Sequence, residues 1–203
     1  MEAISYMSLD ASKFETSDIN YEQEFINLMQ NIYKCYKLIV HDSIRIPKND
    51  ENAIRDILLL NYINDTNTRH NKCAISGYRF HKEVDVNDGR VDIKIDAAYD
   101  FEEFDSYFII ECKRLDGKNA LNRAYVNHGI KRFTTSYRSS SLKYYYPSSY
   151  GVNGMIGFVI NNIDVDANIN GLAAEFNTLK KDILYESNHT NVKLFHLMMD
   201  FSR

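Results

Sequence analysis

The stretch GRVDIKIDAAYDFEEFDSYFIIECKRLDG, residues 89–117, determines the centre of the predicted fold. Its first part, RVDIKIDA (90–97), alternates apolar and charged side chains, which is typical of a half-buried strand. Its later part, SYFIIECK (106–113), is an apolar run of the kind that is buried on both faces of a sheet. We therefore predict two strands here, with the second one central in the sheet.

Charged residues lie at the point where the central strand ends. Residues i and i+2 of a strand share a face, so Glu111 and Lys113 point the same way and Cys112 points into the opposite layer. If the two strands pair, the carboxylates of Asp92 and Glu111 meet at one edge of the sheet. Together with the backbone carbonyl of Cys112, they form an oxygen-only set that suits Mg²⁺, for which Mn²⁺ can substitute.

A plainer interpretation of these charges stands beside the metal site. Asp92 and Glu111 would then be solvated charges at strand ends, with Lys113 as their salt-bridge partner. An acid that ends a central strand needs a partner or a metal, and this favours the metal site.

The rest of the chain divides into alternating apolar patterns. Helical spacing predicts helices over 21–40, from Asp50 or Glu51 to about Tyr62, over about 120–137, and within 166–185. Further strands are predicted over 74–84, 155–161 and 192–201, and loops over 64–72 and 138–154. Three meander strands, a crossover helix and another strand imply an α/β (α+β) fold with a mixed sheet covered by helices.

Length and composition exclude several classes of protein. The 203 residues suit one domain, with residues 1–18 as a loose lead. A formal net charge of -4 excludes nucleic-acid binding by bulk charge alone. We expect no membrane span and no secretory leader, because no apolar run is long enough and the start lacks a basic and an apolar region. The three widely spaced cysteines predict buried thiols in a reducing cytoplasm.

A basic segment follows the central strand. Residues 113–143 contain eight Lys or Arg and one acid, Asp116, which suits a polyanionic substrate, although each basic residue could also belong to a solvated helix face. His128 and Arg132 lie four apart, on one face of the predicted helix. The run KYYYPSSY (143–150) either offers rings for stacking on unpaired bases or packs on the core or a partner subunit.

The segments GRVDI and YFIIECKRL together resemble the core motif of the PD-(D/E)xK nuclease superfamily, which has the restriction-endonuclease-like fold. That motif has an acid on the second core strand and Glu-x-Lys on the third, matched here by Asp92, Glu111 and Lys113. The chain departs from the pattern at Val91, where the named motif has proline. The superfamily often adds a glutamate from the preceding helix, for which Glu51 is the match and Asp56 the runner-up.

The resemblance covers about half of the chain. The superfamily's core order of helix, three strands, helix and strand (αβββαβ) matches the elements expected over 51–160. The helix over 21–40 and the C-terminal helix and strand over 161–203 are then additions to one nuclease domain.

The resemblance implies a metal-dependent nuclease, with a DNA endonuclease as the first expectation. Asp92 and Glu111 would hold Mg²⁺, with Glu51 helping directly or through water, and Lys113 would position the attacking water. The nucleic-acid contacts would come from the basic segment, with Arg132 first, then Lys131 and His128, and with Arg114 and Arg138 beside them. Restriction, phage defence, repair and a mobile element all remain open as its setting.

Two other hypotheses remain beside the free-standing nuclease. The chain could be a catalytically silent subunit that binds nucleic acid or protein on the same fold. It could also cleave only as a homodimer or with a partner subunit, and the helix over 21–40 would then offer the contact face. DNA is expected before RNA as the nucleic acid that the protein binds, and the sequence leaves the choice open.

Overall fold

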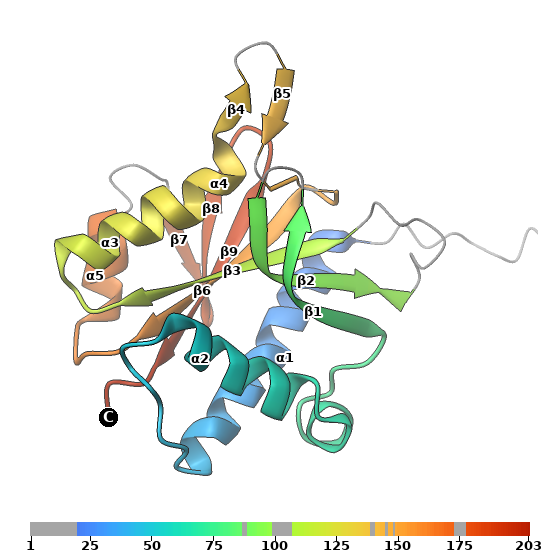
Figure 1. Cartoon of the computed structure of the whole chain (residues 1–203), viewed down its shortest axis with the longest axis vertical. Helices are drawn as coiled ribbons and strands as arrows, with labels where there is room; N and C mark the ends of the chain where they lie inside the picture. The colour runs from blue at the N-terminus through green and yellow to red at the C-terminus, as the bar shows by residue number, and fades with distance from the viewer. Residues whose placement is uncertain are drawn as a thin grey trace, which may run out of the picture.

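The computed structural model describes residues 20–86, 89–98, 107–138, 141–144, 146, 147, 149–172 and 178–203. The predicted lead over 1–18 lies outside the described residues. Within them, a seven-stranded sheet has the order β1-β2-β3-β6-β9-β8-β7 and is flanked by helices on both faces (Figure 1). The prediction of a mixed sheet covered by helices is confirmed.

The sheet is antiparallel at both ends and parallel in the middle. Its strands are β1 (Tyr78–Val86), β2 (Gly89–Ala97), β3 (Phe108–Leu115), β6 (Val152–Val159), β7 (Thr178–Lys181), β8 (Leu184–Asn188) and β9 (Lys193–Asp200). β3 pairs with β6 and β6 with β9 in parallel, while β1–β2, β2–β3, β7–β8 and β8–β9 pair antiparallel. The parallel step from β3 to β6 requires a crossover, which the intervening helix provides.

One face of the sheet is covered by α1 (Tyr21–His41) and by α2 (Glu51–Asp56) with its π-helical continuation η2 (Ile57–Ile63) (Figure 1). The apolar stripe of α1 is buried against this face, and each large side chain in it contributes about 1.5–3 kcal/mol. That stripe is therefore used inside the chain and is not free to contact a second copy.

The other face carries the crossover helix, which runs through α3 (Asn119–Tyr125), the π-helical segment η5 (Val126–Ile130) and α4 (Lys131–Thr134). α5 (Val165–Leu172) packs on the same face, and the two helices share a second core with β3, β6 and β9. Leu194 and Met155 belong to this core, whereas Cys112 belongs to the core under α1. Glu111 and Lys113 therefore lie on the crossover-helix side, as the period of the strand predicts.

Three predicted elements are corrected by the structure. The predicted helix within 166–185 ends at Leu172, and the chain then forms the hairpin β7–β8, in which Asp182 turns at φ 58°. Of the predicted stripe, Leu172 ends α5, Leu179 and Leu184 lie in β7 and β8, and Phe176 lies outside the described residues. Leu184 is buried as a strand residue opposite Leu197. The pairing of β8 with β7 and β9 determines the structure here, and the local sequence pattern carries no information about that pairing.

The two predicted loops also contain regular structure. Residues 64–72 include the π-helical turn η3 (Thr68–Lys72), where the Asp65 carboxylate accepts a hydrogen bond from the Thr68 backbone at 2.8 Å. Residues 138–154 include β5 (Ser141–Tyr144), which pairs with β4 (Ser136–Arg138) in a hairpin that projects beyond α4 (Figure 1), and the start of β6. Tyr144, the first tyrosine of the KYYYPSSY run, ends β5 opposite Ser136, and tyrosine is a residue type that strands favour.

Two further predictions concern the cysteines and membrane-spanning helices. Cys35, Cys73 and Cys112 are free, buried thiols, as predicted. None of the described helices is both long enough and apolar enough to cross a membrane.

Candidate functional site

The site lies where β2 and β3 separate. Their pairing ends at Ile93 opposite Ile110, while β3 continues to pair with β6 as far as Leu115. One more step of the same register would set Asp92 opposite Glu111. A cleft of about 580 Å³ opens at this point, so the predicted meeting of the two carboxylates at the opening of the sheet is found in the structure.

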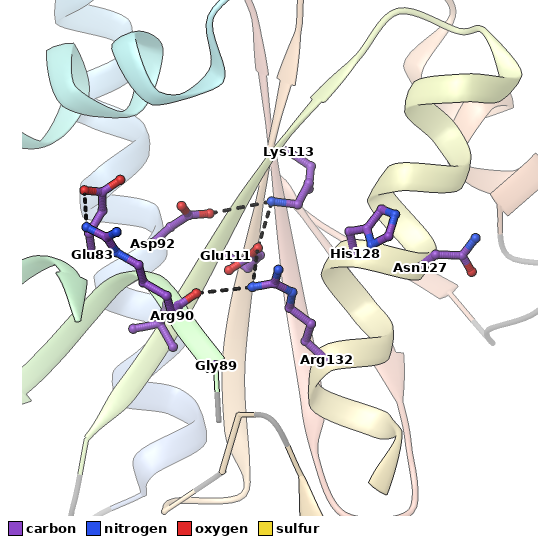
Figure 2. Close-up of a pocket in the computed structure, with 10 residues that line it drawn as sticks. Glu83, Gly89, Arg90, Asp92, Glu111, Lys113, Asn127, His128 and Arg132 are labelled. Atoms are coloured by element: carbon purple, nitrogen blue, oxygen red, sulfur yellow. Dashed lines mark hydrogen bonds and ion pairs between the residues drawn. The ribbon is translucent and has the colours of Figure 1, made fainter. Parts of the chain in front are cut away.

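The cleft is lined from β1, β2, β3 and the crossover helix, as Figure 2 shows. Its lining residues are Glu83, Gly89, Arg90, Val91, Asp92, Glu111, Lys113, Asn127, His128 and Arg132. Three acids and three bases among them cancel in formal charge when His128 is neutral. The cleft alone therefore offers a polyanion little net attraction, and an added cation would make it positive.

The ammonium group of Lys113 lies among four oxygen atoms that we call the oxygen cage. Its Nζ is 2.7 Å from Glu111 Oε1, 2.7 Å from the Cys112 carbonyl oxygen, 3.1 Å from Glu51 Oε1 and 3.8 Å from Asp92 Oδ2. Burial lowers the pKa of Lys113, but the negative charges of Glu111, Asp92 and Glu51 outweigh it and raise the pKa. Lys113 is thus a bound cation held by the same atoms that the sequence predicted as metal ligands.

Glu51 reaches the cage from the first residue of α2. Asp50 caps this helix by accepting a hydrogen bond from the Ala53 backbone at 3.0 Å, which places Glu51 at its N-terminus. Glu51 Oε2 also accepts from the backbone N–H of Arg114 at 2.8 Å. The runner-up Asp56 instead binds Arg55 and Lys82, so of the two predicted candidates Glu51 is the one at the cage.

Asp92 is held by contacts on both carboxylate oxygens. Oδ1 accepts from Arg55 Nη1 at 3.0 Å, and Oδ2 accepts from the backbone N–H of Cys112 at 2.8 Å. Arg55 is 1% exposed and lies behind the cleft. These contacts fix the rotation of the Asp92 carboxylate and turn Oδ2 toward the cage.

Glu111 is the most deeply buried acid of the cleft, with 2% of its surface exposed. Burial and, next, the charge of Asp92 raise its pKa from 4.5 to about 7, against the opposing effects of Lys113 and Arg132. A pKa near neutrality is a common property of functional carboxyl groups.

Tyr146 and Arg132 cover Glu111 from the side of the crossover helix. The Tyr146 hydroxyl lies 2.9 Å from Glu111 Oε2 and 2.5 Å from the Arg90 carbonyl oxygen, so its single hydrogen serves one of the two. Arg132 Nη1 donates to the same hydroxyl, and it lies 3.7 Å from Glu111 Oε1. Tyr146 is buried against Phe133, which supports packing and not base stacking as the role of this ring of the KYYYPSSY run.

The π-helical segment η5 brings the crossover helix close to β3. A Cβ at Gly129 would lie 2.5 Å from Met155 Cε and 3.5 Å from Lys113 Cγ, so glycine permits this approach. π-Helical turns occur frequently at functional sites. Here the turn presents His128 and Asn127 beside the cleft (Figure 2).

The predicted nucleic-acid contacts are only partly brought together. Arg132 and His128 line the cleft, whereas Lys131 is exposed and lies outside the lining. Arg114 donates to the Lys48 carbonyl oxygen at 3.3 Å. The backbone of Arg138 lies in β4, and its side chain lies outside the description.

Sequence reasoning missed Arg55, Glu83, Arg90 and Tyr146 as residues of the site. Tyr146 lies in the KYYYPSSY run, for which the sequence predicts either base stacking or packing and gives no signal of a contact with Glu111. Arg55 follows Glu51 by four residues, one helical turn, which was the only available sign that it belongs near the site.

The donor set fits a hard divalent cation. Two carboxylates and one carbonyl oxygen, all oxygen donors, are what Mg²⁺ takes from proteins while keeping several waters. Among the described residues, no cluster of three or more His, Cys, Asp or Glu side chains has a metal-binding arrangement. The fit therefore rests on the carboxylates of Asp92 and Glu111 and on the Lys113 ammonium, a cation that the oxygen cage already accommodates.

Comparisons of the chain with protein-family models, curated proteins and solved structures found no match.

Removing the Tyr146 hydroxyl tests its link to Glu111. Tyr146→Phe is expected to lower the free energy of unfolding by about 1–3 kcal/mol, because the buried hydroxyl that links Glu111, Arg132 and the Arg90 carbonyl is lost. Tyr33→Phe on α1, whose ring packs on Tyr36, is the control for loss of a hydroxyl away from the cleft. Urea unfolding of both variants measures the effect, and equal stabilities would contradict a role for this hydroxyl.

Proposed function

We propose that the protein is a metal-dependent nuclease of the PD-(D/E)xK type, with a restriction-endonuclease-like fold. The observation that carries the proposal is the cation in the oxygen cage. A buried ammonium lies within 2.7 Å of both Glu111 Oε1 and the Cys112 carbonyl at the base of a cleft. Acids and a lysine gathered in a cleft, with a carboxyl pKa raised by burial and by a neighbouring charge, are typical of catalytic sites.

The order of elements supports the fold assignment. A helix, three antiparallel meander strands, a crossover helix and a parallel strand follow one another from Glu51 to Val159, with the β4–β5 hairpin inserted before the last strand. Asp92 comes from the second of these strands, and Glu111 and Lys113 come from the third.

The predicted site residues have distinct roles in phosphodiester hydrolysis. Mg²⁺ held by Asp92, Glu111 and the Cys112 carbonyl, with Glu51 directly or through water, would activate a water molecule and neutralise charge on the leaving oxygen. Lys113 would orient the attacking water. Arg132 and His128 hold the phosphate from the opposite wall of the cleft.

The charge balance of the cleft explains how metal and substrate binding are coupled. Because the three acids and three bases of the lining cancel, a bound divalent ion gives the cleft a positive charge. The positively charged cleft then attracts the phosphate backbone of a nucleic acid at the place where it is to be cleaved. We expect this nucleic acid to be DNA before RNA. We expect substrate binding to require the metal.

A cleavage assay with matched variants tests the proposal. Linear and circular duplex DNA, single-stranded DNA and RNA are each incubated with Mg²⁺, Mn²⁺ or EDTA. Asp92→Asn and Glu111→Gln are expected to lower cleavage by about 10³-fold or more, since each removes a charge that holds the metal. Asp96→Asn is the control, because Asp96 lies on the same strand and binds Lys94 and His81 away from the cleft.

The same cation supports a second candidate function, the catalytically silent binding subunit. Lys113 already neutralises Glu111 at 2.7 Å, so the cage is stable without metal. Calorimetry separates the two functions. Mg²⁺ binding that is lost in Asp92→Asn supports the nuclease, whereas no binding of Mg²⁺ or Mn²⁺ to the wild-type protein supports the silent subunit.

A further inference from the structure

Glu83 has an unusual backbone conformation for a residue inside a strand. Its φ is 51°, in the left-handed region that is costly for any residue except glycine. The other described non-glycine residues with positive φ, Ser43, Ala74 and Asp182, lie outside strands, in turns or connections. Strain of this kind persists where surrounding contacts impose it, and it is found most often at functional sites.

The position of Glu83 relates it to Asp92. β1 and β2 pair at Lys82–Ile93 and again at Val84–Val91, and the pair between these two would be Glu83–Asp92. The strained residue therefore lies directly across from the predicted metal ligand. Its side chain lines the cleft beside Arg90, as Figure 2 shows.

Arg55 connects the two acids. Its guanidinium lies 3.0 Å from Asp92 Oδ1, 3.3 Å from Glu83 Oε1 and 2.8 Å from Asp56 Oδ1. A guanidinium is planar and donates in fixed directions, so three carboxylates around it hold one another in place. A buried cation also requires balancing anions, and Arg55 is almost fully buried.

We propose that Arg55 and Glu83 are positioning residues for metal binding by Asp92. Arg55 fixes Asp92 Oδ1, so that Oδ2 faces the oxygen cage. Glu83 and Asp56 also pair with Arg55, so three carboxylates together hold its guanidinium in place. The strained backbone of Glu83 is what delivers its carboxylate to Arg55. This inference rests on the proposed metal-dependent function.

Three variants test the carboxylate and the strained backbone of Glu83. Glu83→Gln removes the charge and keeps the backbone conformation strained. Glu83→Gly removes the side chain and relaxes φ at this position. Asp182→Gly relaxes another left-handed residue, at φ 58°, in the turn between β7 and β8, and leaves the cleft unchanged.

The measurement is the Mg²⁺ dissociation constant by titration calorimetry, with circular dichroism to verify the fold. Glu83→Gln and Glu83→Gly are expected to weaken Mg²⁺ binding by about 10-fold or more, the usual effect of losing a partner behind a metal ligand. Asp182→Gly is expected to bind Mg²⁺ like the wild type. This comparison does not depend on the identity of the nucleic-acid substrate.

The outcomes distinguish this inference from the proposed function. Wild-type affinity in both folded Glu83 variants would overturn the positioning role and leave the nuclease proposal intact. A wild-type protein that binds neither Mg²⁺ nor Mn²⁺ would overturn the proposed function and the inference with it.

Discussion

Lys113→Met is expected to lower cleavage strongly and at the same time to tighten Mg²⁺ binding. The Lys113 ammonium lies within 3.1 Å of three cage oxygens, so lysine and metal compete for them. Methionine has a similar length and no charge, and it removes the competitor. We expect metal affinity at pH 8.5 to rise at least about 10-fold, because a full positive charge next to the ion is lost.

Cleavage by Lys113→Met should fall by about 10²–10⁴-fold, the usual contribution of a group that manages the proton and position of the attacking water. Lys94→Met is the matched control. Lys94 lies on β2, next to the strand of Lys113, pairs with Asp96 of β2 at 2.7 Å and lies outside the cleft lining. Calorimetry and cleavage rates are measured on both variants. Weaker metal binding in Lys113→Met would contradict the competition, and undiminished cleavage would contradict the catalytic role.

The central strands and their acids were predictable because their information is local. The alternation correctly predicts that Val91, Ile93 and Ile95 are buried, and all three are 0% exposed. It does not predict that Val91 joins the core of the crossover helix, whereas Ile93 and Ile95 join the core under α1. The period of two separates Cys112 from Glu111 and Lys113. The placement of Glu51 at the cage followed from the resemblance to a known motif and not from the pattern of α2 itself.

The rest of the site depends on contacts between elements that the sequence does not encode locally. Arg55 meets Asp92 across 37 residues of chain, and Tyr146 meets Glu111 across 35. Neither pair shares a helix or strand, so no periodicity joins them. The left-handed conformation of Glu83 is equally invisible, because the strand pattern around it is that of an ordinary edge strand.

The pKa of Glu111 makes metal binding depend on pH in a specified direction. A ligand carboxylate must be ionised, and burial together with Asp92 raises the pKa of Glu111 to about 7. Below that value each Mg²⁺ bound releases one proton from Glu111, so affinity should fall about 10-fold per pH unit. Above it, affinity should be constant. Calorimetry between pH 5.5 and 8.5 measures the slope, and a flat profile below pH 7 would contradict the raised pKa.

The raised pKa of Glu111 predicts that the metal-free protein becomes less stable as pH rises, whereas Mg²⁺ binding becomes tighter. Between 4.5 and about 7 the folded state holds a proton on Glu111 that the unfolded state has released. The free energy of unfolding therefore falls as pH rises through this window, by up to about 3 kcal/mol from this group. Glu111→Gln cannot titrate and should lack this component. Urea unfolding of both proteins in EDTA at pH 5 and pH 8 measures the difference, and identical pH profiles would show that Glu111 ionises at its ordinary pKa.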